Sequence, residues 1–183
     1  MTLKEKKFTY DDYLKLGGEE RYEVIGGELL MAPAPRPYHQ DVCAQIFLSL
    51  REFVKKNELG KVYFAPIDLI LDRENIVQPD ILFVSERNRE TIKERGIFGV
   101  PDLIVEVVSP STFVRDTEYK KNLYERFGVK EFWLAFPNDR VFQVWSLTDK
   151  GYELYSYAEE EGKVSSKLLE GFELDIRDVF EVD

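Results

Sequence analysis

The chain has 183 residues, of which 44% are hydrophobic and 33% charged, and we expect a single globular domain over residues 1–183. Its only cysteine, Cys43, excludes an intrachain disulfide and a zinc site built from several cysteines, which favours a reducing compartment. No segment has the roughly 20 consecutive apolar residues of a membrane helix, and the start lacks the apolar stretch of a secretion signal. Together these features predict a cytoplasmic protein.

The formal net charge of −10 argues against a polyanionic partner, because contacts with phosphates need Lys and Arg. The charge is unevenly distributed along the chain, however. From Ser85 to Lys130 there are nine basic and eight acidic residues, whereas from Gly151 to Asp183 there are three basic and ten acidic ones. Either these charges are only solvated surface, or the near-neutral stretch is the part that meets nucleic acid, and the composition leaves both interpretations open.

The N-terminal third predicts two helices separated by a hairpin. A short helix is expected over residues 9–16, with Thr9 as its N-cap. In YEVIGGELLMAP a Gly-Gly pair lies between two apolar runs, which is typical of a β-hairpin. Over residues 38–57 the apolar positions recur at helical spacing, and Gly60 is expected to stop this amphipathic helix.

Three apolar runs, VYFAPIDLIL, QPDILFV and LIVEVVS, predict central strands that are neighbours in one sheet and are covered on both faces. Between the last two we expect a short helix over residues 90–94. After SPST, whose hydroxyls can cap free amides, a helix is expected over residues 116–127, ended by Gly128. The runs EFWLAF, RVFQVWSL, YELYSYA and KVSSKLL follow as strands, the last three antiparallel and joined by turns. The predicted fold class is therefore α/β, with a mixed central sheet flanked by helices and added antiparallel hairpins.

Two carboxylates on the central strands indicate a metal site. Along LIVEVV alternate side chains share a face, so Glu106 interrupts a face that Ile104 and Val108 otherwise make apolar. A buried carboxylate needs a cation, a metal ion or a proton. Asp80 lies at the start of the strand ILFV, and if the two strands are adjacent, the carboxylates of Asp80 and Glu106 converge as oxygen ligands suited to Mg²⁺ or Mn²⁺. Acidic residues on strands also form structural ion pairs, which the pair alone does not exclude.

The order of a Pro-Asp pair, a strand glutamate and a nearby lysine resembles the PD-(D/E)XK nuclease superfamily. The usual lysine position, two residues after the glutamate, holds Val108 here, but the next predicted helix carries Asp116 and Lys120 at i and i+4, on one helix face. The chain also contains YEVIGGEL, the PxPxxxH run that ends at His39, QPDILFV, VEVVSPST and FWLAFP. With these motifs, residues 21–145 resemble the Uma-two family of restriction endonucleases.

The resemblance implies a restriction-endonuclease-like core that hydrolyses phosphodiester bonds in nucleic acid, with DNA as substrate and Mg²⁺ or Mn²⁺ as cofactor. Asp80, Glu106 and the backbone carbonyl of Val107 are then the metal ligands, and Lys120 orients the attacking water or stabilises the transition state. In the alternative interpretation, Lys120 only forms a structural salt bridge with Glu106 or Asp116. A homodimer would suit a cut through both strands of a duplex.

Four more residues are candidates for the edge of the site: Glu23, His39, Gln78 and Tyr124. His39, the only histidine, could be a metal neighbour or a proton carrier, although a histidine at a helix start more often caps or packs. The hydroxyl of Tyr124 could reach a phosphate, or the ring could belong to the core. The rival to an active nuclease is a non-catalytic member of the same fold that binds nucleic acid or a partner protein.

Overall fold

The computed structural model describes residues 7–18 and 20–181. The helices are α1 (Tyr10–Tyr13), α2 (Pro37–Lys56), α3 (Lys121–Phe127) and α4 (Ile176–Phe180), with a 3₁₀ helix η1 (Glu86–Thr91) and a π-helix η2 (Arg115–Lys120). The strands are β1 (Arg21–Ile25), β2 (Glu28–Ala32), β3 (Gly60–Phe64), β4 (Leu69–Asp72), β5 (Asn75–Val77), β6 (Ile81–Ser85), β7 (Ile92–Lys93), β8 (Gly96–Phe98), β9 (Leu103–Val107), β10 (Glu131–Phe136), β11 (Val141–Thr148), β12 (Gly151–Glu159), β13 (Lys163–Ser165) and β14 (Glu173–Asp175). Among the residues described, no helix is both long and apolar enough to cross a membrane.

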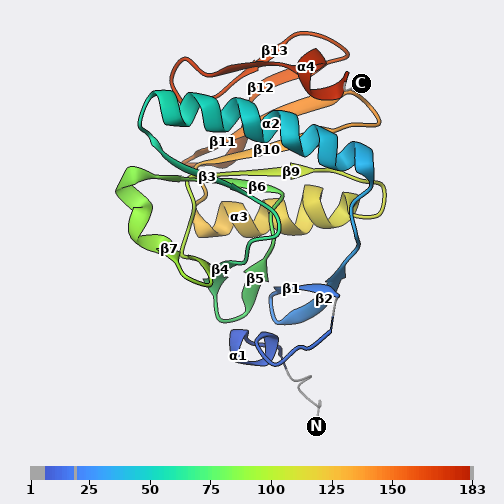
Figure 1. The fold of residues 1–183 in the computed structure, drawn as a ribbon, viewed down its shortest axis with the longest axis vertical. Coiled ribbons are helices and arrows are strands. Elements are labelled where there is room, and N and C mark those ends of the chain that lie inside the picture. Colours follow the sequence, from blue (N-terminus) through green and yellow to red (C-terminus); the bar gives the residue numbers. More distant parts are fainter. Residues whose placement is uncertain (1–6, 19, 182–183) are drawn as a thin grey trace.

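A six-stranded mixed sheet forms the centre of the molecule, with strand order β12-β11-β10-β9-β6-β3 (Figure 1). Strands β9 and β10 are parallel, and every other neighbouring pair in this sheet is antiparallel. The predicted neighbourhood of the QPDILFV and LIVEVVS strands is therefore confirmed, since β6 pairs directly with β9. The α/β prediction with a mixed central sheet is confirmed as well.

A second six-stranded sheet, with order β2-β1-β5-β4-β8-β7, was not predicted. The run VYFAPIDLIL, predicted as one strand, is divided between the two sheets: β3 pairs with β6 in the first, and β4 pairs with β5 in the second. The chain leaves the first sheet at the cis peptide bond between Ala65 and Pro66, where a proline has no N–H to donate to a strand ladder. The predicted hairpin around the Gly-Gly pair is confirmed as β1 and β2, which form one edge of the second sheet.

The predicted helix over residues 90–94 is wrong. The helical segment is η1, which follows β6 directly, and residues 92–98 form the small antiparallel hairpin of β7 and β8. The buried carboxylate of Asp102 accounts for the shift, because it accepts hydrogen bonds from the backbone N–H of Ser85 and the side chain of Asn88 and so fixes the turn at the end of β6.

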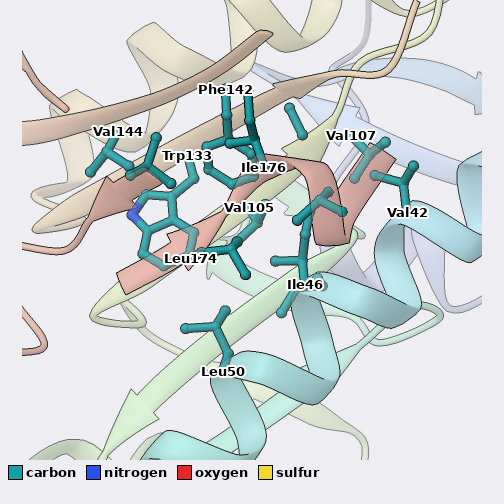
Figure 2. Packing of buried hydrophobic residues seen from close by; sticks show 14 of the residues in the cluster. Val42, Ile46, Leu50, Val105, Val107, Trp133, Phe142, Val144, Leu174 and Ile176 are labelled. Carbon is teal, nitrogen blue, oxygen red and sulfur yellow. The ribbon is translucent and has the colours of Figure 1, made fainter. Parts of the chain in front are cut away.

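One face of the central sheet is covered by α2 and the C-terminal segment (Figure 1). Residues one or two turns apart on α2, among them Val42, Ile46 and Leu50, are buried against Val105 of β9 and Trp133 of β10 (Figure 2). The predicted helix is confirmed, but Gly60 does not stop it. The helix ends with Asn57 as its C-cap. Gly60 instead begins β3 with φ +150°, where an added Cβ would collide with the carbonyl oxygen of Val84.

The other face of the central sheet packs on α3 and the second sheet. Leu123 and Tyr124 of α3 are buried against Ile104 of β9 and Phe132 of β10. The alternation predicted along β9 is thus confirmed: Ile104 belongs to this cluster, whereas Val105 belongs to the cluster under α2. The consequence for the site is that Glu106 must lie on the α3 face of the sheet.

Candidate active site

A cavity of about 370 Å³ opens where β9 ends, beside the start of α2 and the first turns of η2. The sequence candidates Asp80, Glu106, Lys120, Glu23 and His39 all line it. The backbone segments around the opening are the loop of residues 32–36, the SPST loop of residues 109–112, and residues 137–138. The structure therefore brings together side chains that are up to about a hundred positions apart in the chain.

Glu106 is 2% exposed and lies on the α3 face of β9. Its Oε1 accepts a hydrogen bond from Lys120 Nζ at 3.1 Å and another from the hydroxyl of Tyr124 at 2.8 Å. Burial raises the pKa of Glu106 well above its ordinary value; the Lys120 charge acts against this rise, whereas the nearby carboxylates of Asp116, Asp80 and Glu23 add to it. Glu106 is therefore a carboxylate that a further cation would readily ionise.

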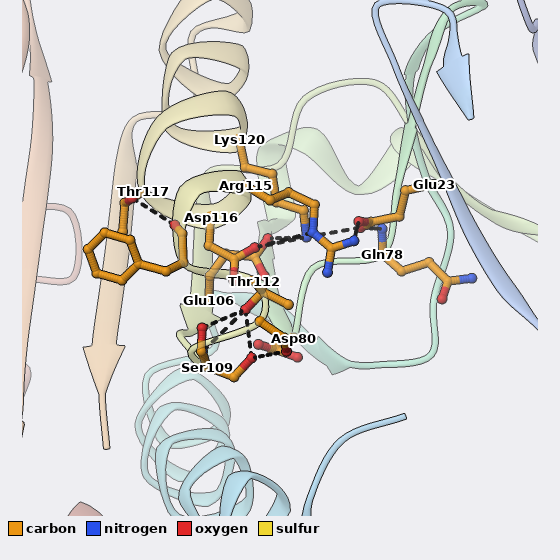
Figure 3. A network of polar contacts seen from close by, with 12 residues as sticks. Glu23, Gln78, Asp80, Glu106, Ser109, Thr112, Arg115, Asp116, Thr117 and Lys120 are labelled. Atoms are coloured by element: carbon orange, nitrogen blue, oxygen red, sulfur yellow. Dashed lines mark hydrogen bonds and ion pairs between the residues drawn. The ribbon is translucent and has the colours of Figure 1, made fainter. Parts of the chain in front are cut away.

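Lys120 is the cation at the centre of the cluster, with 3% of its surface exposed. Its Nζ lies 2.9 Å from Glu23 Oε1, 3.1 Å from Glu106 Oε1 and 3.8 Å from Asp116 Oδ1 (Figure 3). Burial acts to lower the pKa of Lys120, but the three carboxylates outweigh burial and raise it. Lys120 consequently stays protonated and cannot act as a base.

The local structure around Lys120 is a π-helix and not the α-helix that the sequence predicted for residues 116–127. Residues 115–120 form η2, and the α-helical turns of α3 begin only at Lys121 and end at Gly128, which has φ +84°. The wider π turn leaves both Asp116 and Lys120 buried. π-helical turns inside helices occur frequently at functional sites.

Asp80 is the more accessible carboxylate of the cavity, with 19% of its side chain exposed. Its Oδ2 accepts a hydrogen bond from the backbone N–H of Val107 at 2.8 Å and lies 3.3 Å from His39 Nε2. Burial acts to lower the pKa of His39, yet the Asp80 carboxylate and the Val107 backbone raise it on balance. A single oxygen, Asp80 Oδ2, thus contacts both His39 and the backbone at the end of β9.

Glu23 of β1 and Gln78, which directly follows β5, support the cluster. Glu23 is 1% exposed, and its Oε1 accepts the backbone N–H of Gln78 at 2.8 Å in addition to its contact with Lys120. The side-chain amide of Gln78 donates instead to Asp68 and to the Tyr13 hydroxyl. Gln78 therefore positions Glu23 through its backbone, and its side chain belongs to a separate polar contact.

Comparisons with known proteins give the family of the chain and a solved structure with the same fold. The Uma2 family, described as "Putative restriction endonuclease", matches residues 10–177. The chain belongs to the Uma2 family. No curated protein matches this Uma2 chain in sequence. A solved structure, the crystal structure of "a putative nuclease belonging to DUF820 from Anabaena variabilis ATCC 29413", superposes with a TM-score of 0.78 at 19% identity, covering 95% of this chain and 98% of the other. That likeness shows a shared fold with a nuclease-like structure.

Two charged residues of this Uma2 site, Arg115 and Asp116, were missed as site members by sequence reasoning. Arg115 lies 3.5 Å from Glu23 Oε2 and donates to the backbone carbonyl of Met31 at 3.2 Å, and Asp116 is 4% exposed. Asp116 could have been found, because it is one helical turn before Lys120. Arg115 could not, because its role depends on the β1-β2 hairpin that lies across the cavity.

The charges at the floor of the Uma2 cavity do not balance. Four carboxylates, those of Glu23, Asp80, Glu106 and Asp116, accompany two permanent cations, Lys120 and Arg115 (Figure 3). Burial raises the pKa of both Glu106 and Asp116; the Lys120 charge acts against both rises, and the Asp80 carboxylate adds to both. A divalent cation fits a floor of this kind, since it supplies the missing charge and prefers oxygen ligands.

The thiol of Cys43 is close to this donor set but is poorly suited to it. One ligand atom each from His39, Cys43 and Asp80 lie within 4.8 Å of one another. His39 turns Nδ1 toward the Cys43 sulfur at 3.5 Å and Nε2 toward Asp80 at 3.3 Å, so the imidazole presents a different nitrogen to each of the two groups. Burial raises the pKa of Cys43, and Asp80 and Glu106 raise it further, which keeps the thiol protonated. The oxygen donors with His39 remain the better set.

Proposed function

We propose that this chain is a metal-dependent endonuclease that hydrolyses phosphodiester bonds in DNA with Mg²⁺ or Mn²⁺. The observation that carries the proposal is the surplus of two carboxylates over permanent cations on the floor of one cavity, beside a buried lysine. Membership of the Uma2 family supports the nuclease class. The ion and the substrate follow from the oxygen-rich donor set and from the family's description.

In this proposal Asp80, Glu106 and the backbone carbonyl of Val107 hold the cation, and His39 Nε2 lies beside Asp80 as a neighbour of the ion. When bound, such an ion lowers the pKa of a coordinated water and neutralises charge that develops at the phosphorus. Asp80 is held in place by the Val107 N–H, and this bond fixes the orientation of its carboxylate toward the cavity.

Lys120 acts through its permanent positive charge. Its ammonium group orients the attacking water and stabilises the extra negative charge of the phosphate in the transition state. Glu23 and Tyr124 are positioning residues: Glu23 holds Lys120 at 2.9 Å, and the Tyr124 hydroxyl holds Glu106 at 2.8 Å. His39, whose Nε2 lies 3.3 Å from Asp80 Oδ2, is the candidate proton carrier at the edge of the site.

Calorimetric titration with Mn²⁺ tests the cation, and a nuclease assay on labelled DNA tests the reaction. The native chain is expected to bind Mn²⁺ and to cut DNA, and an Asp80→Asn, Glu106→Gln double variant is expected to lose both. Glu170→Gln, which changes an exposed glutamate outside the cavity, is the matched control and should behave as the native chain does. Native protein that binds no Mn²⁺ and cuts nothing would favour the rival, a non-catalytic nuclease-fold module.

A further inference from the structure

We propose that the strand to be cut enters the cavity unpaired, so that the substrate is single-stranded DNA or an unpaired segment of a longer DNA. This inference rests on the proposed function and deepens it by naming the substrate class. Three features of the cavity carry it: the depth of the charged floor, the scarcity of free cations around it, and the exposed aromatic rings on its wall.

The charged groups lie at the bottom of the cavity. Glu23, Glu106, Asp116 and Lys120 are each between 1% and 4% exposed, whereas the side chains of Asp80, His39 and Arg115 are 15–19% exposed. A duplex carries its phosphates on a stiff, convex helix, and bending that helix into a cavity of about 370 Å³ costs deformation energy. An unpaired strand is flexible and can place one phosphate at the floor without that cost.

The cations available to a phosphate backbone are few. Among the described residues that line the cavity, the basic ones are Arg21, Arg36, His39, Arg115 and Lys120. Arg115 and Lys120 are engaged with Glu23 and His39 with Asp80, which leaves two arginines, Arg21 and Arg36. The electrostatic part of DNA affinity grows with the number of phosphates that Lys and Arg neutralise, so two arginines supply little of it. The affinity of this cavity for a DNA strand must therefore come largely from contacts with groups other than the phosphates.

Exposed aromatic rings supply such contacts. Phe64, the last residue of β3, lines the cavity with 56% of its surface exposed, and its ring packs on Phe47 of α2 with centroids 4.6 Å apart. Tyr38 also lines the cavity, is 39% exposed, and is held by a hydrogen bond from its hydroxyl to the carbonyl of Phe180. Aromatic rings that are held in place by neighbouring residues and have an exposed face can stack with unpaired bases.

The test compares the affinity of the native chain for one labelled oligonucleotide, unpaired or annealed to its complement, by fluorescence anisotropy in the presence of Ca²⁺. We expect the unpaired form to bind more tightly. Phe64→Ala should weaken that binding roughly tenfold and leave the weaker duplex binding unchanged, whereas Phe64→Tyr, which keeps the ring, should restore it. Tyr155→Ala removes a comparably exposed ring, at 47%, from β12 outside the cavity and is the matched control.

Equal or tighter binding of the duplex, or a Phe64→Ala variant that is folded yet binds like the native chain, would overturn the inference. Cleavage of duplex DNA that depends on Asp80 would then leave the proposed function standing by itself. If the native chain binds neither form and cuts neither form, both proposals fail together. Thermal unfolding of each variant shows whether a loss of binding reflects a loss of fold.

Discussion

Replacing Lys120 by methionine is the sharpest perturbation of the buried cluster. Methionine has nearly the length of the lysine stem but removes the ammonium charge that lies 2.9, 3.1 and 3.8 Å from Glu23, Glu106 and Asp116, and of these Glu106 has no contact with Arg115 to replace it. Removing one partner of a buried ion pair costs about 3–5 kcal/mol of unfolding free energy, because the charge left behind is uncompensated. We expect a loss in this range near neutral pH, since three contacts disappear and only protonation of a carboxylate can relieve the site.

The loss should also depend on pH. A carboxyl group with a raised pKa keeps its proton in the folded state, whereas the same group in the unfolded state loses its proton above about pH 4.3. The unfolding free energy therefore falls as pH rises from about 4.3 to the higher pKa of the folded state. Burial first, and then the neighbouring carboxylates, already raise the pKa of Glu106, and removing the Lys120 charge that opposes this must raise it further. Each additional proton held by the folded variant steepens the fall by about 1.4 kcal/mol per pH unit.

Urea unfolding of the native chain and of Lys120→Met at several pH values between about 5 and about 8 measures both effects. Adding Glu106→Gln to Lys120→Met should recover part of the loss, because it removes one of the uncompensated charges while Tyr124 keeps an acceptor. Lys61→Met, at an exposed position on β3, is the control and should change stability by less than about 0.5 kcal/mol. A loss for Lys120→Met below about 1 kcal/mol, or one that does not vary with pH, would refute the reasoning.

Two further outcomes follow from other buried carboxylates. Glu131→Gln should lower the unfolding free energy by at least about 2 kcal/mol. Glu131 is fully buried and accepts hydrogen bonds from Trp133 Nε1, Ser166 Oγ and the backbone amides of residues 167 and 168. Urea unfolding measures the loss, and hydrogen exchange at these two amides should become faster. For Asp102, burial acts to raise the pKa, but hydrogen bonds from Lys130 and the Ser85 backbone lower it on balance, so its contribution is present above about pH 4 and is lost as pH falls through the lower folded pKa. Asp102→Asn should therefore flatten the acid side of a stability-versus-pH curve, and a variant curve parallel to the native one would contradict this.

Local patterns determined much of the fold. The helical spacing of apolar residues from Tyr38 to Asn57 predicted α2 within one residue at each end, and strict alternation along LIVEVV assigned the two faces of β9 correctly. Both signals are local, because periodicity in the chain repeats the periodicity of the element. The same alternation indicated Glu106 as a carboxylate facing the core, and the i, i+4 spacing of Asp116 and Lys120 is the other feature of the site that local pattern reveals.

The sequence by itself thus specified an α/β chain with helix and strand periodicities and marked Asp80, Glu106 and Lys120 as residues of chemical interest. Tertiary structure decided the rest: the division of VYFAPIDLIL between two sheets, the π turn that buries Asp116 beside Lys120, and the approach of Arg115 to Glu23. These depend on contacts between segments far apart in the chain, and the energy of such a contact is set by which other side chains share its buried space. The spacing of residues along the chain does not show which side chains meet in the folded protein. The surplus of carboxylates at the floor of the cavity is therefore visible only in the tertiary structure.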